Sequence, residues 1–182
     1  MFNDKYGLTQ AVLEGRKTQT RRTFLKPGDD TLLDAITPEY IISVRSRYKL
    51  GETIAIAQSY KDIHAEILRE VGDWDLKKEF QKSKGYTNKM FVRAEKMPHA
   101  IRITNICVER LQDISEEDCM KEGIWRDDNV GLEGTTYWYH GLVNSSFRIP
   151  QAAYASLIDS ISGKGTWASN PYVFVYDFEL IN

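Results

Sequence analysis

The amino-acid sequence predicts an α+β fold in which a curled β-sheet carries peripheral helices. Two stretches have the pattern of β-strands. In residues 172–180, large apolar side chains on one face alternate with the side chains of the other face, as the period of two in a strand requires. Residues 100–111 form a second long stretch with Ile and Val at intervals. The remaining apolar periodicity predicts short helices, several of which end at a glycine.

The first third of the chain predicts one helix and two strands. Apolar residues within 6–13 indicate a short amphipathic helix that Gly15 ends. Residues 40–44, Tyr-Ile-Ile-Ser-Val, favour a strand because they are rich in β-branched and aromatic side chains. Residues 53–58 predict another strand, whose Ile and Ala content is typical of burial on both faces.

The middle of the chain predicts a helix, a short strand and the long strand. Residues 62–74 carry apolar side chains at four-residue spacing, which indicates a helix. Residues 89–93 favour a short strand. Within the long strand, the apolar parity changes between Ile103 and Ile106, which predicts a β-bulge or burial on both faces.

The last third predicts two helices around a long loop. Ser115 is a candidate N-cap, and Gly123 ends the helix that follows it. Residues 125–147 are rich in Gly, Asn and aromatic side chains, which indicates a loop that contains a small hairpin. Pro150 opens a helix with one apolar face, and Gly163 ends it.

Composition places the chain among soluble globular proteins. Its 182 residues suit one domain, and 42% hydrophobic with 27% charged residues is not the balance of a disordered or fibrous chain. No apolar run approaches the roughly 20 residues that span a membrane, and the N-terminus lacks a signal-peptide pattern. Cys107 and Cys119 cannot form a disulfide framework, so we expect reduced thiols and a cytoplasmic protein.

Neither a metal site nor a cofactor motif is expected. The three histidines are scattered, no pair has ligand spacing, and Gly-rich phosphate loops and nucleophile-elbow serines are absent from the sequence. The formal net charge of −2 argues against bulk electrostatic binding of DNA, although it leaves room for a local nucleic-acid site.

One octet, residues 15–22, concentrates the positive charge. Its sequence is Gly-Arg-Lys-Thr-Gln-Thr-Arg-Arg, with four cations, two hydroxyls and no acid. Because the chain is slightly acidic overall, the octet predicts a local positive patch that attracts anions. The alternative is that the charge run is simply a solvated face.

Lys17 and Thr20 are the candidate reactive pair of the octet. In a strand, positions three apart point to opposite faces, whereas in a turn they converge, and the preceding Gly15 favours a turn. Crowding by the neighbouring arginines should lower the pKa of Lys17. A lysine that loses its proton readily, next to a hydroxyl, can activate a threonine nucleophile.

Glu122 is the third candidate. It lies in the last turn of the predicted helix that Ser115 opens, where the helix dipole disfavours a carboxylate. Such a locally unfavourable choice can mark a functional constraint. The alternative, that Glu122 only pairs with a nearby cation, has equal support from the sequence.

The octet resembles the signature of a known family. Gly15, Lys17 and Arg22 match the Gly-x-Lys-x-x-x-x-Arg pattern of the ASCH domain, a member of the PUA-like group of small β-barrels. Residues 51–56, 103–124 and 173–180 are similar to later strands and a helix of that family. The resemblance implies a single ASCH/PUA-like domain over residues 1–182, a small β-barrel with peripheral helices and insertions.

Two functions follow from this resemblance. The first is binding of RNA or of a modified nucleoside or nucleotide in a barrel cleft, through the octet. The residues implied in binding are Gly15, Arg16, Lys17, Arg21 and Arg22.

A separate hypothesis, which requires no small ligand or RNA, treats the octet as a protein-docking surface.

The second function is hydrolysis of an amide. The octet is similar to the Gly-Arg-Lys-Thr-x-Thr-x-Arg segment of amidohydrolases that remove the acetyl group of N(4)-acetylcytidine. By that analogy Thr20 attacks the acyl carbonyl, Lys17 accepts its proton and Glu122 handles proton transfer to the leaving amine. Arg22 would hold the loop or an oxyanion. The stretches at about 23–47, 60–97 and 125–150 have no counterpart in those shorter enzymes.

A separate aromatic cluster is a candidate surface for stacking nucleobases. It comprises the run Tyr137-Trp138-Tyr139-His140 with Trp125 and Trp167. The alternative is that these side chains pack against each other or in the core.

Overall fold

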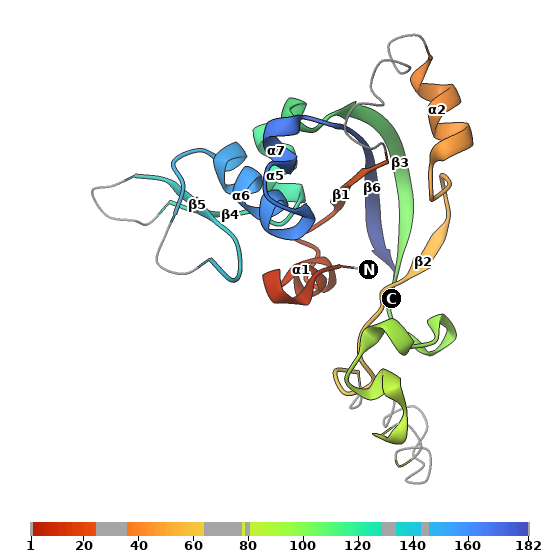
Figure 1. Cartoon of the computed structure of the whole chain (residues 1–182). Coiled ribbons are helices and arrows are strands. Elements are labelled where there is room, and N and C mark those ends of the chain that lie inside the picture. Colours follow the sequence, from red (N-terminus) through yellow and green to blue (C-terminus); the bar gives the residue numbers. More distant parts are fainter. Residues whose placement is uncertain are drawn as a thin grey trace.

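A four-stranded antiparallel sheet, curled along its length, forms the centre of the protein in a computed structural model (Figure 1). The structure describes residues 2–24, 36–63, 78, 81–128, 134–142 and 146–181. The strand order is β1 (Gln19–Thr23), β6 (Tyr172–Ile181), β3 (Ala100–Arg110) and β2 (Thr53–Ala55). The α+β class predicted from the sequence is therefore confirmed, as is the curled sheet.

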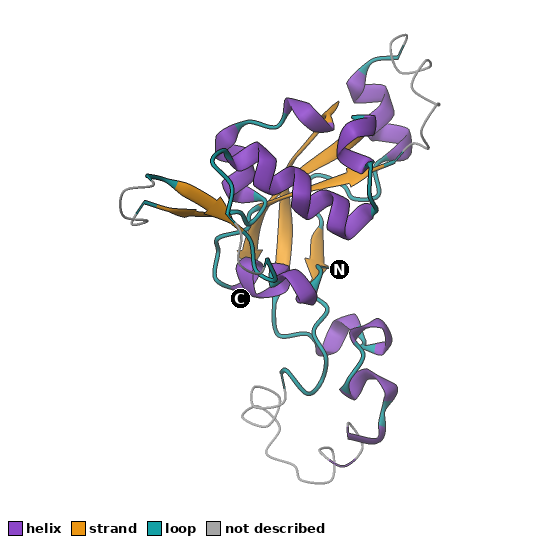
Figure 2. Cartoon of the chain, turned by 60° about the vertical axis from the view of Figure 1, so that its left-hand side comes forward, coloured by secondary structure: helices purple, strands orange, loops and turns teal. Residues whose placement is uncertain are grey.

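Helices surround the sheet, and a short hairpin projects from it (Figures 1 and 2). The α-helices are α1 (Leu8–Leu13), α2 (Pro38–Arg45), α5 (Glu116–Lys121), α6 (Pro150–Ser162) and α7 (Thr166–Ser169). The 3₁₀ helices are η1 (Asp4–Tyr6), η3 (Lys84–Tyr86), η4 (Lys89–Phe91), η5 (Ala94–Lys96) and η6 (Leu111–Asp113). The hairpin pairs β4 (Trp125–Asp127) with β5 (Thr136–Trp138), where the sequence predicted a loop with a small hairpin.

The two long strands predicted from the sequence, β3 and β6, pair along nearly their whole length. Cys107 lies opposite Val175 in their register, and the register shifts between Ile103 and Asn105. The predicted bulge is thus confirmed, and it lies within the interval from Ile103 to Ile106 where the apolar parity changes. In β6, residues 173–176 are all buried, so both faces of this strand are covered.

Three helices cover one face of the sheet near β1, and Figures 1 and 2 show α5, α6 and α7 grouped there. The apolar face of α6 is buried through Tyr154, Leu157 and Ile158, and Gly163 caps the helix with a φ of 109°. The predicted helix beginning at Pro150 is therefore confirmed. α1 ends as expected too, since the chain turns at Gly15 with a φ of 71°.

The strand predicted at residues 40–44 is wrong, because this stretch lies in α2. The Thr37 hydroxyl accepts a hydrogen bond from the Tyr40 backbone N–H, and Pro38 occupies the first turn. These two helix-start signals outweigh the β-branched run that follows. A β-branched run is favourable in a strand whose side chains are buried against their neighbours. Here only Ile41 of α2 is buried, so this stretch gains little from a strand conformation.

The expectation for residues 89–93 is also wrong. Lys89–Phe91 form a 3₁₀ helix, because the Asn88 side chain accepts a hydrogen bond from the Met90 N–H and turns the chain. The strand expected over 53–58 is shorter, covering Thr53–Ala55. The helix predicted at 62–74 lies outside the described residues from residue 64 onward.

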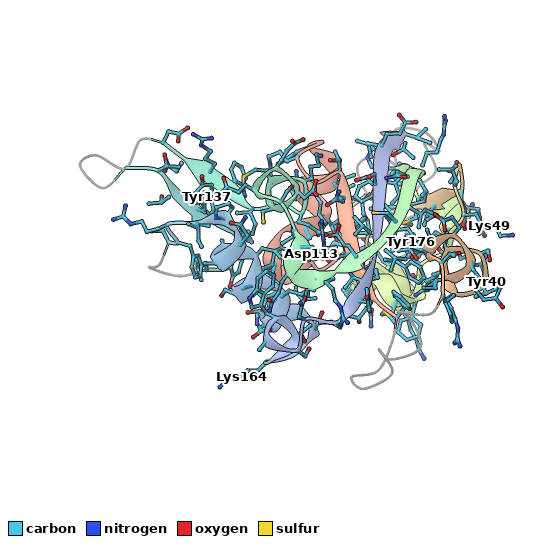
Figure 3. The ribbon with its side chains drawn as sticks, turned by 90° about the horizontal axis from the view of Figure 1, so that it is seen from above. Tyr40, Lys49, Asp113, Tyr137, Lys164 and Tyr176 are labelled. Carbon is cyan, nitrogen blue, oxygen red and sulfur yellow. The ribbon has the colours of Figure 1, made fainter. Side chains whose placement is uncertain are left out.

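The helix α2 and the hairpin of β4 and β5 lie at two ends of the molecule. Seen from above, Tyr40 in α2 and Tyr137 in the hairpin mark opposite ends, with Tyr176 of β6 between them (Figure 3). No helix in the described part of the chain is both long and apolar enough to cross a membrane.

We expect the cap of α5 to stabilise the fold measurably. The Ser115 hydroxyl accepts a hydrogen bond of 3.0 Å from the Asp118 N–H, so Ser115→Ala should lower the free energy of unfolding by about 1 kcal/mol. Urea denaturation followed by circular dichroism measures the change. Ser160→Ala, at an exposed position inside α6, is the matched control and should leave stability unchanged or slightly higher. Equal loss in both variants would contradict the capping role.

Candidate functional site

The first half of the octet forms a tight turn that is held against α1 and α5. After Gly15, the Lys17 backbone N–H donates to the Ala11 carbonyl at 2.9 Å, and the Thr18 N–H donates to the Lys121 carbonyl at 3.0 Å. The turn expected at Gly15 is therefore present. It ends at Thr18, because residues 19–23 form β1, so the turn expected to bring Lys17 and Thr20 together does not extend to Thr20.

The Lys17 amine is buried and donates to three oxygens. The residue is 2% exposed. Its Nζ lies 2.7 Å from the Gln19 carbonyl, 2.9 Å from the Glu122 carbonyl and 2.5 Å from Glu122 Oε2. The three donors of an ammonium group are thus all used, and two of them are directed at one residue.

Glu122 caps the C-terminal end of α5, where the sequence placed it. The unfavourable position of a carboxylate at this helix end is offset because Lys17 bonds both the carboxylate and the terminal carbonyl. Gly123 follows with a φ of 101°, and a Cβ added there would lie 3.8 Å from the Lys17 Cβ. The glycine lets the helix end approach the octet closely. Glu122 does pair with a cation, and that cation is the candidate lysine itself.

Arg21 is buried on the same side of the cluster. Its side chain has no exposed area, and its guanidinium lies 2.7 Å from Glu109, 3.4 Å from Asp118 and 3.3 Å from Glu122. It also donates to the Gln19 side chain. Arg21 is therefore a structural cation that gathers three carboxylates from β3 and α5.

The octet is consequently not the positive patch that the sequence predicted. Arg16 pairs with Glu14, Lys17 with Glu122, and Arg21 with the carboxylates just named. Of its four cations, Arg22 is the one whose residue is exposed and lines a cleft. For Lys17 and Arg21 the sequence could not reveal this compensation, because their acids at positions 109, 118 and 122 come from distant parts of the chain.

Burial lowers the pKa of the Lys17 amine below that of an ordinary lysine. The Glu122 carboxylate acts in the opposite direction, and the cations of Arg22 and Arg21 add smaller lowering effects. The lowered pKa expected from the sequence is thus found, but its main cause is desolvation rather than crowding by arginines. Arg16, which was expected to contribute, points instead to Glu14 and Trp125.

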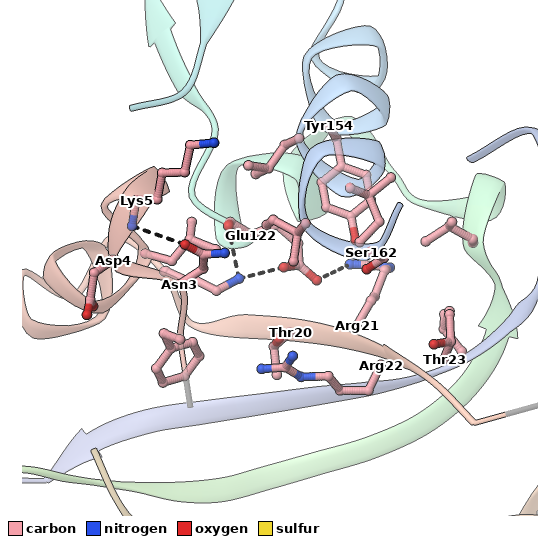
Figure 4. A pocket seen from close by; sticks show the side chains of 18 of the residues that line it. Asn3, Asp4, Lys5, Thr20, Arg21, Arg22, Thr23, Glu122, Tyr154 and Ser162 are labelled. Carbon is pink, nitrogen blue, oxygen red and sulfur yellow. Dashed lines mark hydrogen bonds and ion pairs between the residues drawn. The ribbon is translucent and has the colours of Figure 1, made fainter. Parts of the chain in front are cut away.

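These residues form one wall of a cleft of about 700 Å³ (Figure 4). The N-terminal segment, β1, the end of α5 and the apolar face of α6 surround it. Its charged lining residues are Asp4, Lys5, Lys17, Arg21, Arg22, Lys89 and Glu122. Its apolar wall includes Leu111, Leu157, Ile158, Ile161 and Val173. Five cations face two lining carboxylates, and Glu109 and Asp118 behind the wall offset part of this charge, so a smaller positive excess remains that favours an anionic ligand.

Thr20 lines the same cleft, but it does not contact the lysine. Thr20 and Arg22 project from one side of β1 and Arg21 from the other, toward Glu122 (Figure 4). No hydrogen bond joins Lys17 and Thr20 in the described structure. The structure thus brings Lys17 and Glu122 into contact, and places Thr20 on the cleft beside them.

Gly15 and Arg16 do not line the cleft. The Arg16 guanidinium lies 3.8 Å from the centre of the Trp125 ring, which in turn stacks on Trp138 at 5.1 Å and 7° between planes. The candidate stacking residues therefore pack against one another. Tyr139 is buried and bonds Ser156, and none of the aromatic cluster lines the cleft in the described structure.

Sequence reasoning missed several lining residues. Lys5 and Lys89 come from segments without a recognisable motif, and Lys89 pairs with Asp4 at 2.7 Å. Tyr154 of α6 was assigned to the apolar face of its helix, and it does lie there, with its hydroxyl in the cleft wall. The one signal in the sequence that could have indicated Tyr154 as a lining residue is its phenol, which stands on an otherwise aliphatic face of α6.

Within the described residues, no three His, Cys, Asp or Glu side chains are grouped so that they could hold a metal ion. The buried thiol of Cys119 has its pKa raised to about 12, chiefly by burial, so it is protonated and inert. The chemistry of the site belongs to its lysine, its carboxylates and its hydroxyls.

A comparison of the chain with protein-family models, with curated proteins and with solved structures gives no match. The resemblance of the octet to the ASCH signature therefore stays a prediction.

The buried ion pair should dominate the stability of the site. Lys17→Met leaves Glu122 buried with only the more distant Arg21, so we expect the free energy of unfolding to fall by about 3–5 kcal/mol. Adding Glu122→Gln should restore part of the loss. Urea denaturation of the single and double variants measures both effects. Arg126→Gln, which breaks an exposed pair with Asp128, is the control and should change little. No recovery in the double variant would contradict coupling between the two residues.

Proposed function

We propose that this chain is an ASCH-type protein of PUA-like fold whose cleft binds one nucleotide or modified nucleoside. The observation that carries the proposal is the cleft itself: about 700 Å³, with an excess of cations on one side and an aliphatic wall on the other. This volume lies within the range of small-ligand sites. Charge attracts a phosphate, and the apolar wall suits the flat face of a base.

A single nucleotide fits this arrangement better than a length of RNA backbone. Binding a backbone needs a row of solvent-facing cations. Arg16 and Arg21, two of the residues expected to contact RNA, pair with carboxylates instead. The positive charge is gathered in a concave site rather than along the surface.

Two cations are best placed to meet a phosphate. Arg22 is exposed on the cleft lining, and Lys5 has no ion pair among the described residues. Lys17 and Arg21 instead stabilise the wall of the cleft, because their N–H donors are bonded to oxygens of the protein. In this proposal, Lys5 and Arg22 provide the affinity for phosphate, and the buried cluster of Lys17, Arg21 and Glu122 determines the shape of the cleft wall.

Removal of the Arg22 charge should weaken nucleotide binding. Arg22→Gln is expected to raise the Kd for cytidine 5′-monophosphate about 10- to 100-fold, because a charge-assisted contact to phosphate is lost. Isothermal titration calorimetry at low and high salt measures the affinity, which should fall as salt rises. Arg102→Gln removes a charge paired with Glu179 away from the cleft and serves as the matched control. Equal affinities of wild type and Arg22→Gln would rule out Arg22 as the phosphate contact.

A second function, hydrolysis of an N(4)-acylated cytidine, is favoured by one specific observation. The buried Lys17 amine has a lowered pKa, touches Glu122 and shares a cleft with the Thr20 hydroxyl. In the proposed reaction Thr20 attacks the acyl carbon and passes its proton to the neutral Lys17 amine, while Glu122 mediates proton transfer to the leaving amine. Water then releases the acyl group from Thr20. The reaction requires the Thr20 side chain to approach Lys17, since they are not hydrogen-bonded in this structure.

This enzyme hypothesis predicts a defined pH profile. Lys17 acts as a base only without its proton, so the rate of acetate release from N(4)-acetylcytidine should rise with pH, with a limb below the pKa of free lysine because burial lowers the pKa of Lys17. Chromatography of cytidine release measures the rate. Thr20→Val, which keeps the shape of the side chain and removes the nucleophile, should reduce release to background, whereas Thr135→Val, at a half-buried position outside the cleft, should not. Undiminished release by Thr20→Val would exclude Thr20 as the nucleophile.

A further inference from the structure

Tyr154 is a buried polar side chain whose hydroxyl has no hydrogen-bond partner among the described residues. It lies on the inner face of α6 with Leu157 and Ile158, is 2% exposed and lines the cleft. Its ring packs edge-on against Trp167 at 6.2 Å, so the hydroxyl is held in one direction. Figure 4 shows it pointing from α6 toward the side of the cleft where Glu122 and Arg21 lie.

The other buried tyrosines all have hydrogen-bond partners. Tyr139 bonds the Ser156 hydroxyl at 2.9 Å, and the Tyr176 oxygen lies 3.1 Å from the Ser46 hydroxyl. The Tyr60 oxygen accepts from the Arg93 N–H, and Tyr6 donates to the Ser160 carbonyl. Tyr154 is the exception, and of these five tyrosines it alone lines the large cleft.

An unsatisfied hydroxyl at this depth is unfavourable for the fold alone. Leaving a buried donor without a partner costs about 1–3 kcal/mol, and phenylalanine would fill the same space without that penalty. A partner supplied by a ligand accounts for a hydroxyl in this place. The side chain borders a cleft of about 700 Å³, which is large enough to hold that partner.

The chemistry of the hydroxyl specifies what the partner is. Burial, with the Glu122 carboxylate second, raises the pKa of Tyr154 well above its ordinary value, so the phenol keeps its proton and can donate. On the side to which the hydroxyl points, the Glu122 carboxylate repels an anionic partner, and Arg21 is already paired with carboxylates. An uncharged acceptor, such as a carbonyl oxygen, satisfies both conditions.

The hydroxyl also lies apart from Lys5, one of the two cations expected to meet a phosphate. In Figure 4, Lys5 lies at the other side of the cleft from Tyr154, with Glu122 between them. A ligand with an anionic end and an uncharged, carbonyl-bearing end can reach both sides at once. Nucleotides with a pyrimidine base have this division of polarity.

We propose that Tyr154 determines ligand specificity by donating a hydrogen bond to an uncharged carbonyl oxygen, either the ring carbonyl of a pyrimidine or an acyl carbonyl attached to it. This inference rests on the proposed nucleotide-binding function and names the part of the ligand that the apolar side of the cleft recognises. A site built around a buried hydroxyl discriminates strongly against ligands that leave it unpaired.

The test compares Tyr154→Phe with wild type and with Tyr139→Phe by calorimetry. The three probes are cytidine 5′-monophosphate, its N(4)-acetyl derivative and ribose 5-phosphate, which has no carbonyl-bearing base. Tyr154→Phe should bind cytidine 5′-monophosphate about 5- to 100-fold more weakly and ribose 5-phosphate as wild type does. A loss confined to the acetylated probe assigns the bond to the acyl carbonyl and also supports the proposal. Tyr139→Phe, which removes a hydroxyl outside the cleft, should bind all three as wild type does.

Three results overturn the inference. If Tyr154→Phe changes no affinity while wild type binds nucleotides, the role of Tyr154 is wrong and the proposed function stands. If ribose 5-phosphate loses as much affinity as the nucleotide, the hydroxyl holds the sugar or phosphate instead. If wild type binds none of the probes, the function and the inference fall together.

Thermal melting without ligand gives a separate check. Tyr154→Phe should melt at or above the temperature of wild type, because it removes an unpaired hydroxyl. Tyr139→Phe should melt lower, because it loses a bond to Ser156. A drop for Tyr154→Phe as large as that for Tyr139→Phe means that the hydroxyl already has a partner within the protein, which also contradicts the inference.

Discussion

The contact between the Lys17 ammonium and the end of α5 determines how the site is assembled. A buried ammonium is tolerated only when its donors are satisfied and its charge is balanced. Lys17 meets both conditions through two oxygens of Glu122 and the carbonyl of Gln19. The contact closes a loop of over one hundred residues and fixes the octet, β1 and α5 as one unit. Arg21 extends this unit to β3 through Glu109, so the wall of the cleft is rigid by construction.

If the cleft binds a ligand as proposed, a charged wall opposite an aliphatic one would make it selective in two separate ways. The excess of cations acts at a distance and attracts any anion of suitable size. The aliphatic side, with its single phenol, acts at contact and distinguishes ligands by shape and by hydrogen bonding. In the proposed function, affinity and specificity would therefore be carried by different elements, the first by the N-terminal segment and β1, the second by α6.

Residue-level signals in the sequence located the centre of the site, because each reflected a local physical requirement. Gly15 indicated a turn, which the chain needs to pass from α1 to the octet. Glu122 stood out because a carboxylate is unfavourable at a helix C-terminus, and the structure pairs it with Lys17. Alternating apolar residues located β6, whose pattern reflects the pleat of the strand itself.

The rest could not be predicted, because it depends on contacts between distant segments. The burial of Arg21 follows from carboxylates at 109, 118 and 122, which no local pattern connects to it. The residues of α2 favour a strand by composition, and only Thr37 and Pro38 reverse that preference. Tyr154 has the helical spacing of a core residue, and its orphan hydroxyl becomes visible only when the neighbours are known.

The pairing of β1 with β6 also separates the roles of two adjacent, chemically identical side chains. Arg21 lies opposite Val175 and Arg22 opposite Phe174, so the pleat turns one guanidinium inward and the other outward. A shift of this edge strand by a single position would exchange the two faces, so that Arg21 would leave the carboxylates of the buried cluster and Arg22 would turn toward them. The pairing of the five residues of β1 with β6 thus determines which arginine joins the buried ion-pair cluster and which one is exposed.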